Sequence, residues 1–396
     1  MKKSIAIIGG GSSALITAAF LDANKFNITI YEKKKSLGRK FLVAGDGGFN
    51  LSHGEAIEKM ITRYTPDTFL KQALLHFTNN DLRKWLLTIG IPTFVGSSNR
   101  VYPEKGIKPI EVLTKIKQFL IDKGVQLVYN YEWKGWSIND KLIFNNNEII
   151  NTDYTIFAMG GASWKITGSD GSWLKIFKNK EINTLPFLPA NCAYAIKWPK
   201  EFILKNEGQP LKNIALSCLD KTQKGELVIT KFGLEGNAIY ALSTEIQSQL
   251  SIKKAATVYL DLKPMFSLNE VIQKINASQL RTIKDILKKT LKLSAPQINL
   301  LKATLTKEEF TNKNILSEKI KALPLTINSA APLNEAISTT GGISLNEVNE
   351  NFELHKLKNN FCIGEMLDWN APTGGYLLQA CFSMGAYIAK YLNDKD

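Results

Sequence analysis

Residues 3–32 carry the clearest hydrophobic pattern of the chain. A short apolar run rich in β-branched residues, Lys3–Ile8, predicts a buried strand. A glycine-rich turn follows it, then the apolar run Leu15–Leu21, which predicts a helix, and then Asn27–Tyr31, which predicts a second strand. A strand, a turn, a helix and a strand in this order predict an α/β unit with parallel strands.

Further apolar segments extend this first unit. A helix is predicted from Pro109 to Gly124, a parallel strand over Val125–Tyr129 and a small antiparallel meander over Trp133–Ile150. The buried run Tyr154–Gly161 ends in glycines, and in FAD proteins a strand at this place returns to the dinucleotide. Near the end of the chain, Phe361–Asp368 predicts another strand that runs into acidic residues before a last helix.

The middle of the chain has a different pattern. The composition changes around Pro186 and Pro189, and the short apolar runs that follow predict strands of an inserted β-barrel or sandwich, with a loop at Phe232–Asn237. Residues 267–322 show apolar residues at helical spacing with lysines between them. Such basic helices bind membranes or RNA in some proteins, but we interpret these as packed helices with a solvated lysine face. The prediction is an α/β fold with a Rossmann-like FAD-binding domain at 1–186 and 325–396, an inserted β-barrel domain at 187–265 and a small helical subdomain at 266–324.

The turn after the first strand carries the candidate chemistry. It has the spacing Gly9-x-Gly11-x-x-Ala14, and Glu32 ends the second strand. Gly9 permits a sharp turn because it lacks a Cβ, and Gly11 lets the backbone approach a pyrophosphate closely. The helix N-terminus offers N–H groups and a partial positive charge to phosphates, and Glu32 can accept hydrogen bonds from ribose hydroxyls. The pattern therefore predicts a dinucleotide site.

Composition narrows the classes of protein. Within 396 residues, no apolar run reaches the roughly 18 residues of a membrane span. The N-terminus resembles a secretory signal, but the stretch 9–13 interrupts its apolar part. Four scattered cysteines and three histidines show no ligand spacing, so we expect a cytoplasmic protein without a metal. The formal charge of +14 suits a nucleic-acid partner, but lysines alternate with acids along most of the chain, so we expect none.

Three loops complete the predicted cofactor site. After Glu32, Arg39 and Lys40 can offset phosphate charge, while Gly45, Gly47 and Gly48 allow close approach to an aromatic ring. At the tail, the Gly364–Glu365 pair suits a ribityl hydroxyl, and the last helix can direct its positive end at the flavin. The predicted cofactor-binding residues are Gly9, Gly11, Ser12, Ala14, Glu32, Lys33, Gly38, Arg39, Lys40, Asn50, Val128, Gly160, Gly161, Gly364, Glu365, Gly374, Gly375 and Tyr376.

Together these stretches resemble a bacterial family of NAD(P)/FAD-dependent oxidoreductases known as aminoacetone-oxidase-like flavoproteins, which has a bile-acid-reductase relative. That family has an FAD domain interrupted by a β-barrel and a small helical subdomain. Much of it carries Arg-Cys-Asn where this chain has Gly48-Phe49-Asn50, which indicates a distinct branch. The resemblance rests on Gly9–Ala14, Gly38–Asn50, Arg100–Pro103, Met159–Trp164, Gly233–Gly236, Gly364–Asp368 and Gly374–Tyr376.

We therefore predict an FAD flavoenzyme that transfers a hydride to or from a small or medium organic molecule. An aminoacetone-oxidase-like amine oxidase would pass its electrons to oxygen. A reductase of an enone or another C=C bond would take them from NAD(P)H, without a second nucleotide fold. An RNA-binding flavoprotein that uses the lysine excess is a third hypothesis. The substrate-side candidates are Tyr102, Asn50, Asp368 and Trp369, and no residue is assigned as acid or base.

Overall fold

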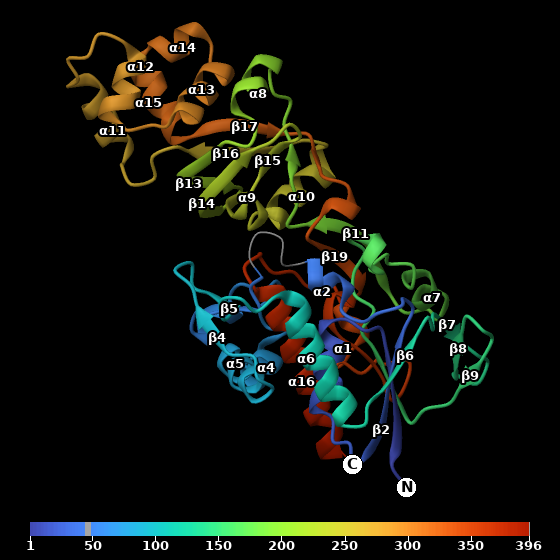
Figure 1. The fold of residues 1–396 in the computed structure, drawn as a ribbon. Coiled ribbons are helices and arrows are strands. Elements are labelled where there is room, and N and C mark those ends of the chain that lie inside the picture. The colour runs from blue at the N-terminus through green and yellow to red at the C-terminus, as the bar shows by residue number, and fades with distance from the viewer. Residues whose placement is uncertain (44–48, 396) are drawn as a thin grey trace. The chain divides into compact units, whose positions relative to one another are not determined.

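A computed structural model describes residues 1–43 and 49–395 of the chain (Figure 1). Contacts divide it into two compact units. Unit 1 comprises Met1–Leu188 and Ser338–Asp396, and unit 2 comprises Pro189–Ile337. Each unit has its own hydrophobic core.

Unit 1 is built on a five-stranded parallel sheet. Its order is β20-β10-β1-β2-β6, so the first strand of the chain lies at the centre. Central parallel strands are covered on both faces, which explains why β1 and β10 read as continuous apolar runs. The predicted parallel strands are confirmed. Their bounds are β1 Lys3–Ile8, β2 Phe26–Glu32, β6 Gln126–Tyr129, β10 Tyr154–Phe157 and β20 Asn360–Cys362.

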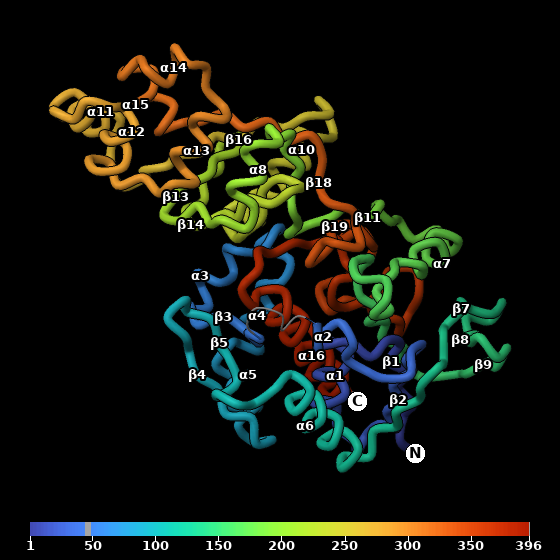
Figure 2. Tube along the Cα trace, turned by 45° about the horizontal axis from the view of Figure 1, so that its top comes forward, coloured from blue at the N-terminus to red at the C-terminus, as the bar shows by residue number. Residues whose placement is uncertain are grey.

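The first helix packs on this sheet, and two further helices pack against it, so that the first and last helices lie side by side (Figures 1 and 2). The three helices are α1 (Ser12–Phe20), α6 (Pro109–Asp122) and α16 (Tyr376–Lys395). Asn393 near the end of α16 donates to the Phe20 carbonyl at 3.0 Å, and its side chain accepts from the Asp22 N–H at 2.8 Å. The tail of the chain is therefore fixed to the first βαβ unit.

Smaller elements of unit 1 surround this core. The predicted antiparallel meander is confirmed as β7 (Trp133–Trp136), β8 (Leu142–Phe144) and β9 (Ile149–Ile150). A second small sheet has the order β3-β5-β4, and β11 pairs with β19. The remaining bounds are α2 Arg39–Val43, β3 Ser52–His53, α3 Ile57–Ile61, α4 Lys71–His76, α5 Asn79–Thr88, β4 Thr93–Val95, β5 Arg100–Pro103, η1 Lys165–Thr167, α7 Leu174–Asn179, β11 Thr184–Ala190, β19 Ser338–Ile343, η4 Leu345–Glu347 and η5 Gly364–Met366.

Unit 2 contains a seven-stranded antiparallel sheet of order β17-β16-β13-β14-β15-β12-β18. Its two end strands, β17 and β18, are separated in sequence only by Asn328. The predicted β-barrel stays a prediction. The predicted loop at Phe232–Asn237 is wrong in part, because Gly233–Glu235 forms β15 between β14 and β12. The other bounds are β12 Tyr194–Ala195, β13 Pro210–Cys218, β14 Lys221–Ile229, β16 Ala256–Asp261, β17 Leu323–Ile327 and β18 Ser329–Ala330.

Helices of unit 2 share one core with these strands. The predicted helical pattern is confirmed, since Ile275, Ile286 and Leu287 are buried while Lys284 and Lys288 are exposed. The predicted boundaries between barrel and helical subdomain stay predictions. The helices are α8 Lys200–Asn206, α9 Asn237–Tyr240, α10 Ser243–Lys253, α11 Leu268–Asn276, α12 Ile283–Asp285, η2 Ile286–Thr290, α13 Ala295–Thr304, α14 Lys307–Thr311 and α15 Lys313–Lys321; η3 (Leu333–Glu335) follows β18.

Two surveys of the described residues bear on the class of protein. Across residues 1–43 and 49–395, none of the helices combines the length and apolar character that a membrane crossing requires. Within the same ranges, no three His, Cys, Asp or Glu side chains gather as ligands for a metal ion.

Candidate functional site

The turn between β1 and α1 has the shape that a dinucleotide needs. Gly9 has a φ of +100°, and a Cβ there would lie 2.6 Å from the Ala158 carbonyl oxygen at the end of β10. At Gly11 a Cβ would meet only that same oxygen, at 4.0 Å, so this side of the turn is open. Gly11 is the N-cap of α1 and has no side chain to cap the helix, which leaves the N–H groups from Ser12 onward for a ligand. Ala14 is fully buried, as close packing of helix and strand requires.

Glu32 lies beside this turn at the carboxyl end of β2. Its Oε2 accepts from the Gly10 N–H and its Oε1 from the Lys34 N–H, both at 2.8 Å. Burial raises the pKa of Glu32, although both hydrogen bonds act in the opposite direction. Each oxygen keeps a lone pair that a ribose hydroxyl can use. Val128 lies on the neighbouring strand, opposite Tyr31.

Segments far apart in sequence meet next to the turn. The Lys40 Nζ donates to the Ser163 Oγ and to the Glu365 Oε2, both at 2.8 Å. The Gly38 N–H donates to the Gly10 carbonyl at 2.8 Å, which fixes the loop after β2 to the glycine turn. The start of the chain, the segment after Gly160 and Gly161, and the tail therefore converge, while their binding of one cofactor stays a prediction.

The basic residues of this loop are mostly paired. Lys33 contacts both oxygens of Asp170 at 2.9 Å. Burial alone would raise the pKa of Asp170, but hydrogen bonds from Lys33 and Ser172 hold it below its usual value. Lys33 and Lys40 each face a carboxylate, whereas Arg39 faces none among the described residues, so Arg39 is a candidate cation for phosphate. Its Nη2 donates to the Ile166 carbonyl at 3.2 Å.

Two buried polar atoms here have no hydrogen-bond partner among the described residues: the Arg39 Nε and the Ser169 Oγ. The Ser169 Oγ lies 3.5 Å from the position that a Cβ on Gly160 would take. A polar ligand along Gly11 and Gly160 would satisfy such atoms, so these residues fit a dinucleotide such as FAD. The sequence prediction missed Ser169, although the polar glycine-containing stretch 167–172 contained the signal.

The loop before α16 packs on the small sheet. Gly375 has a φ of +103°, and a Cβ there would lie within 2.6 Å of the Ser52 backbone. Tyr376 begins α16, but its hydroxyl donates to the Glu55 Oε1 at 2.6 Å. The side chain of Tyr376 therefore fixes the helix, and what remains for a cofactor is the backbone N–H groups of the first turn.

Glu55 is the centre of a buried polar network that the sequence prediction missed. Arg63 contacts both of its oxygens at 3.1 Å, and the His53 ring stacks on Tyr376 with 4.8 Å between centroids. Burial works to raise the pKa of Glu55, but hydrogen bonds from Arg63 and Tyr376 hold it below its usual value. Asn79 donates to the carbonyls of His53 and Glu55, which fixes their backbone. Glu55 follows no recognisable motif, so spacing alone could not have found it.

Of the four substrate-side candidates, two have side chains that join loops, and the other two lie on or next to β5. Asp368 accepts from the Gly341 N–H at 2.7 Å, and the Trp369 Nε1 donates to the Gly364 carbonyl at 2.9 Å, so both side chains tie loops together. Tyr102 is half-buried on β5 and stacks on Phe94 at 5.7 Å. Asn50 precedes Leu51, whose N–H donates to the carbonyl of Val101 on β5, the strand that also carries Tyr102.

Arg100 lies in this region and was not among the predicted site residues. Its Nε would be 3.4 Å from a Cβ on Gly374, and among the described residues no carboxylate pairs with its guanidinium. A half-buried cation beside the glycine loop is a candidate ligand for a carbonyl oxygen. The predicted contacts of Gly45, Gly47 and Gly48 lie outside the described residues.

Comparisons with known proteins agree with this geometry. A family model described as the HI0933-like protein Rossmann domain matches residues 3–391. The 3-dehydro-bile acid delta(4,6)-reductase of Clostridium scindens is 24% identical over 406 residues, with 97% of this chain and 97% of that protein covered. The ribosomal RNA dihydrouridine synthase of Haemophilus influenzae is 23% identical over 395 residues, with 95% of each covered.

Among solved structures, the open conformation of a flavocytochrome c3 fumarate reductase has a TM-score of 0.51 at 11% identity, over 100% of this chain and 79% of that one. This likeness concerns the fold alone. The predicted Rossmann-like FAD-binding fold is confirmed, and so is the bile-acid-reductase relative. The aminoacetone-oxidase name stays a prediction.

Proposed function

Since the chain belongs to the HI0933-like Rossmann family, we propose that it is an FAD-dependent reductase of a carbon–carbon double bond conjugated to a carbonyl group. The observation that carries this proposal is the similarity to a bile-acid delta(4,6)-reductase along 97% of both chains. The second relative also has a reductive name, because a dihydrouridine is a uridine whose ring double bond is saturated.

The residues of unit 1 suit this reaction. Bound FAD would supply hydride chemistry at its N5. The open side of Gly11 and the first turn of α1 would hold the pyrophosphate, and Glu32 would bind the ribose. The N-terminus of α16 is positioned by Tyr376 and Glu55, and its partial positive charge would stabilise an anionic ring. Arg100 would bind the carbonyl oxygen of the substrate and so favour hydride addition at the β-carbon.

The test is an anaerobic stopped-flow experiment on the FAD-loaded protein. NADPH or NADH should bleach the flavin absorbance, and a 3-keto-Δ4 steroid or a simple cyclic enone should restore it without oxygen. Bleaching by an amine, followed by peroxide release in air, would instead support the amine-oxidase hypothesis. Failure of every nicotinamide and enone pair to change the spectrum would contradict the reductase proposal.

A second candidate substrate is ribosomal RNA. It is favoured by the similarity to a ribosomal RNA dihydrouridine synthase over 95% of both chains and by the formal charge of +14. The uracil double bond is conjugated to a carbonyl, so the same site chemistry would apply, although the charge pattern along the sequence led us to expect no nucleic-acid partner. Ribosomal RNA incubated with the protein and NADPH, then digested and examined by mass spectrometry, should gain dihydrouridine. An unchanged dihydrouridine content would remove this candidate.

A further inference from the structure

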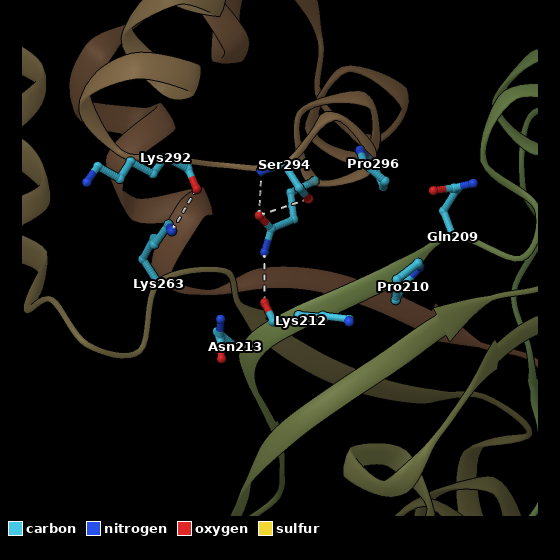
Figure 3. A pocket seen from close by; sticks show the side chains of 9 residues that line it. Gln209, Pro210, Lys212, Asn213, Lys263, Lys292, Ser294 and Pro296 are labelled. Carbon is cyan, nitrogen blue, oxygen red and sulfur yellow. Dashed lines mark hydrogen bonds between the residues drawn. The ribbon is translucent and has the colours of Figure 1, made fainter. Parts of the chain in front are cut away.

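Unit 2 contains a pocket of about 290 Å³ that the proposed flavin chemistry does not use (Figure 3). It lies between β13, the residues that follow β16 and the start of α13. Its lining is polar and basic: Gln209, Pro210, Lys212, Asn213, Lys263, Lys292, Ser294, Pro296 and Gln297.

The charged side chains that line this pocket are all positive. Three lysines line it, and within the described part of the chain no carboxylate does. The nearest acid along the sequence, Asp261, pairs with Lys321 at 2.6 Å and accepts from the Lys263 backbone N–H at 2.8 Å. Burial and the nearby Lys292 lower the pKa of Lys263, so this ammonium lacks local compensation. An anion in the pocket would supply it.

The walls of the pocket are fixed to one another. Gln297 accepts from the Ser294 N–H at 2.9 Å and donates to the Lys212 carbonyl at 3.3 Å, which joins α13 to β13. The Lys263 Nζ donates to the Lys292 carbonyl at 3.0 Å. Asn213 lies in the register shift of β13 with a φ of +54° and Lys292 has a φ of +52°, so both hold left-handed backbone conformations that non-glycine residues seldom adopt. The backbone segments that carry the lysines are thus fixed to one another, and the Lys263 ammonium is held by the Lys292 carbonyl.

We propose that this pocket binds the phosphodiester backbone of RNA. In Figure 3 the side chains of Lys212 and Lys292 extend in opposite directions, and the Lys292 ammonium points away from the other labelled residues. This spread suits successive phosphates of a chain better than one small anion, while Asn213, Gln209 and Gln297 supply amide groups for sugars or bases. Unit 2 as a whole carries twenty-one Lys and Arg against thirteen Asp and Glu, an excess of eight positive charges out of the chain's fourteen.

This proposal rests on RNA as the substrate, and it is tested by binding rather than by turnover. The readout is fluorescence anisotropy of a labelled single-stranded RNA oligonucleotide with the full-length protein over a series of KCl concentrations. The pocket variant carries Lys212→Gln, Lys263→Gln and Lys292→Gln. The matched control carries Lys224→Gln, Lys231→Gln and Lys253→Gln, three exposed lysines of unit 2 outside the pocket.

The pocket variant should bind about tenfold or more weakly, and its slope of log K against log[KCl] should fall by about two, because each phosphate contact on a single strand contributes about 0.7. The control should keep both values within a factor of about two. Since Lys263 also donates to a backbone carbonyl, Lys212→Gln alone is included, and it should weaken binding about twofold to fivefold without changing the melting temperature.

Equal losses of RNA affinity in the pocket variant and the control would show that the pocket is not the RNA site, but RNA would remain a candidate substrate. Absence of RNA binding by the unchanged protein at low salt would contradict both the RNA site and RNA as a substrate, while the enone reaction of unit 1 would still be measurable. Competition by inorganic phosphate at matched ionic strength distinguishes a free phosphate ligand from an RNA phosphodiester. If micromolar phosphate displaces RNA from the unchanged protein but not from the pocket variant, the pocket binds free phosphate and the RNA assignment is wrong.

Discussion

At the scale of single residues, Gly9 and Gly11 do different work within one turn. Gly11→Ala keeps an ordinary backbone, with φ near −84°, but places a methyl group in the open space assigned to the pyrophosphate. Gly9→Ala forces a Cβ against the Ala158 carbonyl at 2.6 Å. Gly11→Ala should therefore lower the FAD content at least about tenfold and leave the melting temperature of the apoprotein unchanged. Gly9→Ala should lower both the FAD content and the melting temperature, because the strained backbone reduces the free energy of unfolding by about 1–3 kcal/mol.

These two quantities are measured by the ratio of flavin to protein absorbance after dialysis and by thermal unfolding of the apoprotein. A Gly11→Ala variant that retains FAD as the unchanged protein does would show that the pyrophosphate lies elsewhere.

Arg100 gives a second prediction at this scale. If its guanidinium binds the substrate carbonyl, Arg100→Gln should lower the rate of flavin reoxidation by an enone about 10²-fold, because a lost oxyanion donor has an effect of that order. Reduction of the flavin by NADPH should change little. Arg83→Gln is the control, since Arg83 donates to Thr93 instead. Equal losses in both half-reactions would show that Arg100 supports the fold rather than the substrate.

At the scale of elements, the Glu55 network anchors the first residue of α16 and contributes to the free energy of unfolding. The folded state holds the pKa of Glu55 below its usual value, so Glu55 contributes stability above the pKa it has when unfolded, near 4.3. That stability is lost as the pH falls through the lower folded pKa. Glu55→Gln should therefore destabilise the protein by about 1–3 kcal/mol at pH 7, since the partly exposed Arg63 loses a charged hydrogen-bond partner.

The difference in unfolding free energy between this variant and the unchanged protein should narrow below about pH 4.5. Denaturant unfolding at pH 7, 5 and 4 measures it. Glu104→Gln, at an exposed position, is the control. A difference that stays constant over this range would show that the Glu55 charge does not carry the effect.

The elements also show where sequence reasoning reaches its limit. The βαβ start, the meander and the tail were predictable because buried parallel strands and glycine turns follow local rules. The strand Gly233–Glu235 was not, because its pairing with β14 and β12 is decided by distant partners. The Arg39 Nε and the Ser169 Oγ, which are buried without a hydrogen-bond partner among the described residues, and the Glu55 network depend on tertiary contacts, so the sequence alone does not reveal them.

At the scale of the whole molecule, the two cores imply two cooperative transitions. Unit 1 contains the glycine turn proposed for FAD, and unit 2 has a separate hydrophobic core of strands and helices. A ligand stabilises the part that binds it by about 2.7 kcal/mol at a hundred times its Kd, so FAD should raise only the transition of unit 1. Differential scanning calorimetry of the apoprotein and the FAD-loaded protein measures this.

Two core truncations in the full-length protein assign the transitions. Leu120→Ala in α6 and Leu216→Ala in β13 remove fully buried side chains of unit 1 and unit 2, and each should cost about 2–5 kcal/mol in its own unit. The transition that moves with Leu120→Ala should be the one that FAD raises, and Leu216→Ala should leave that transition unchanged. A single transition that moves equally with both substitutions would contradict this independence, because unit 2 would then unfold cooperatively with unit 1.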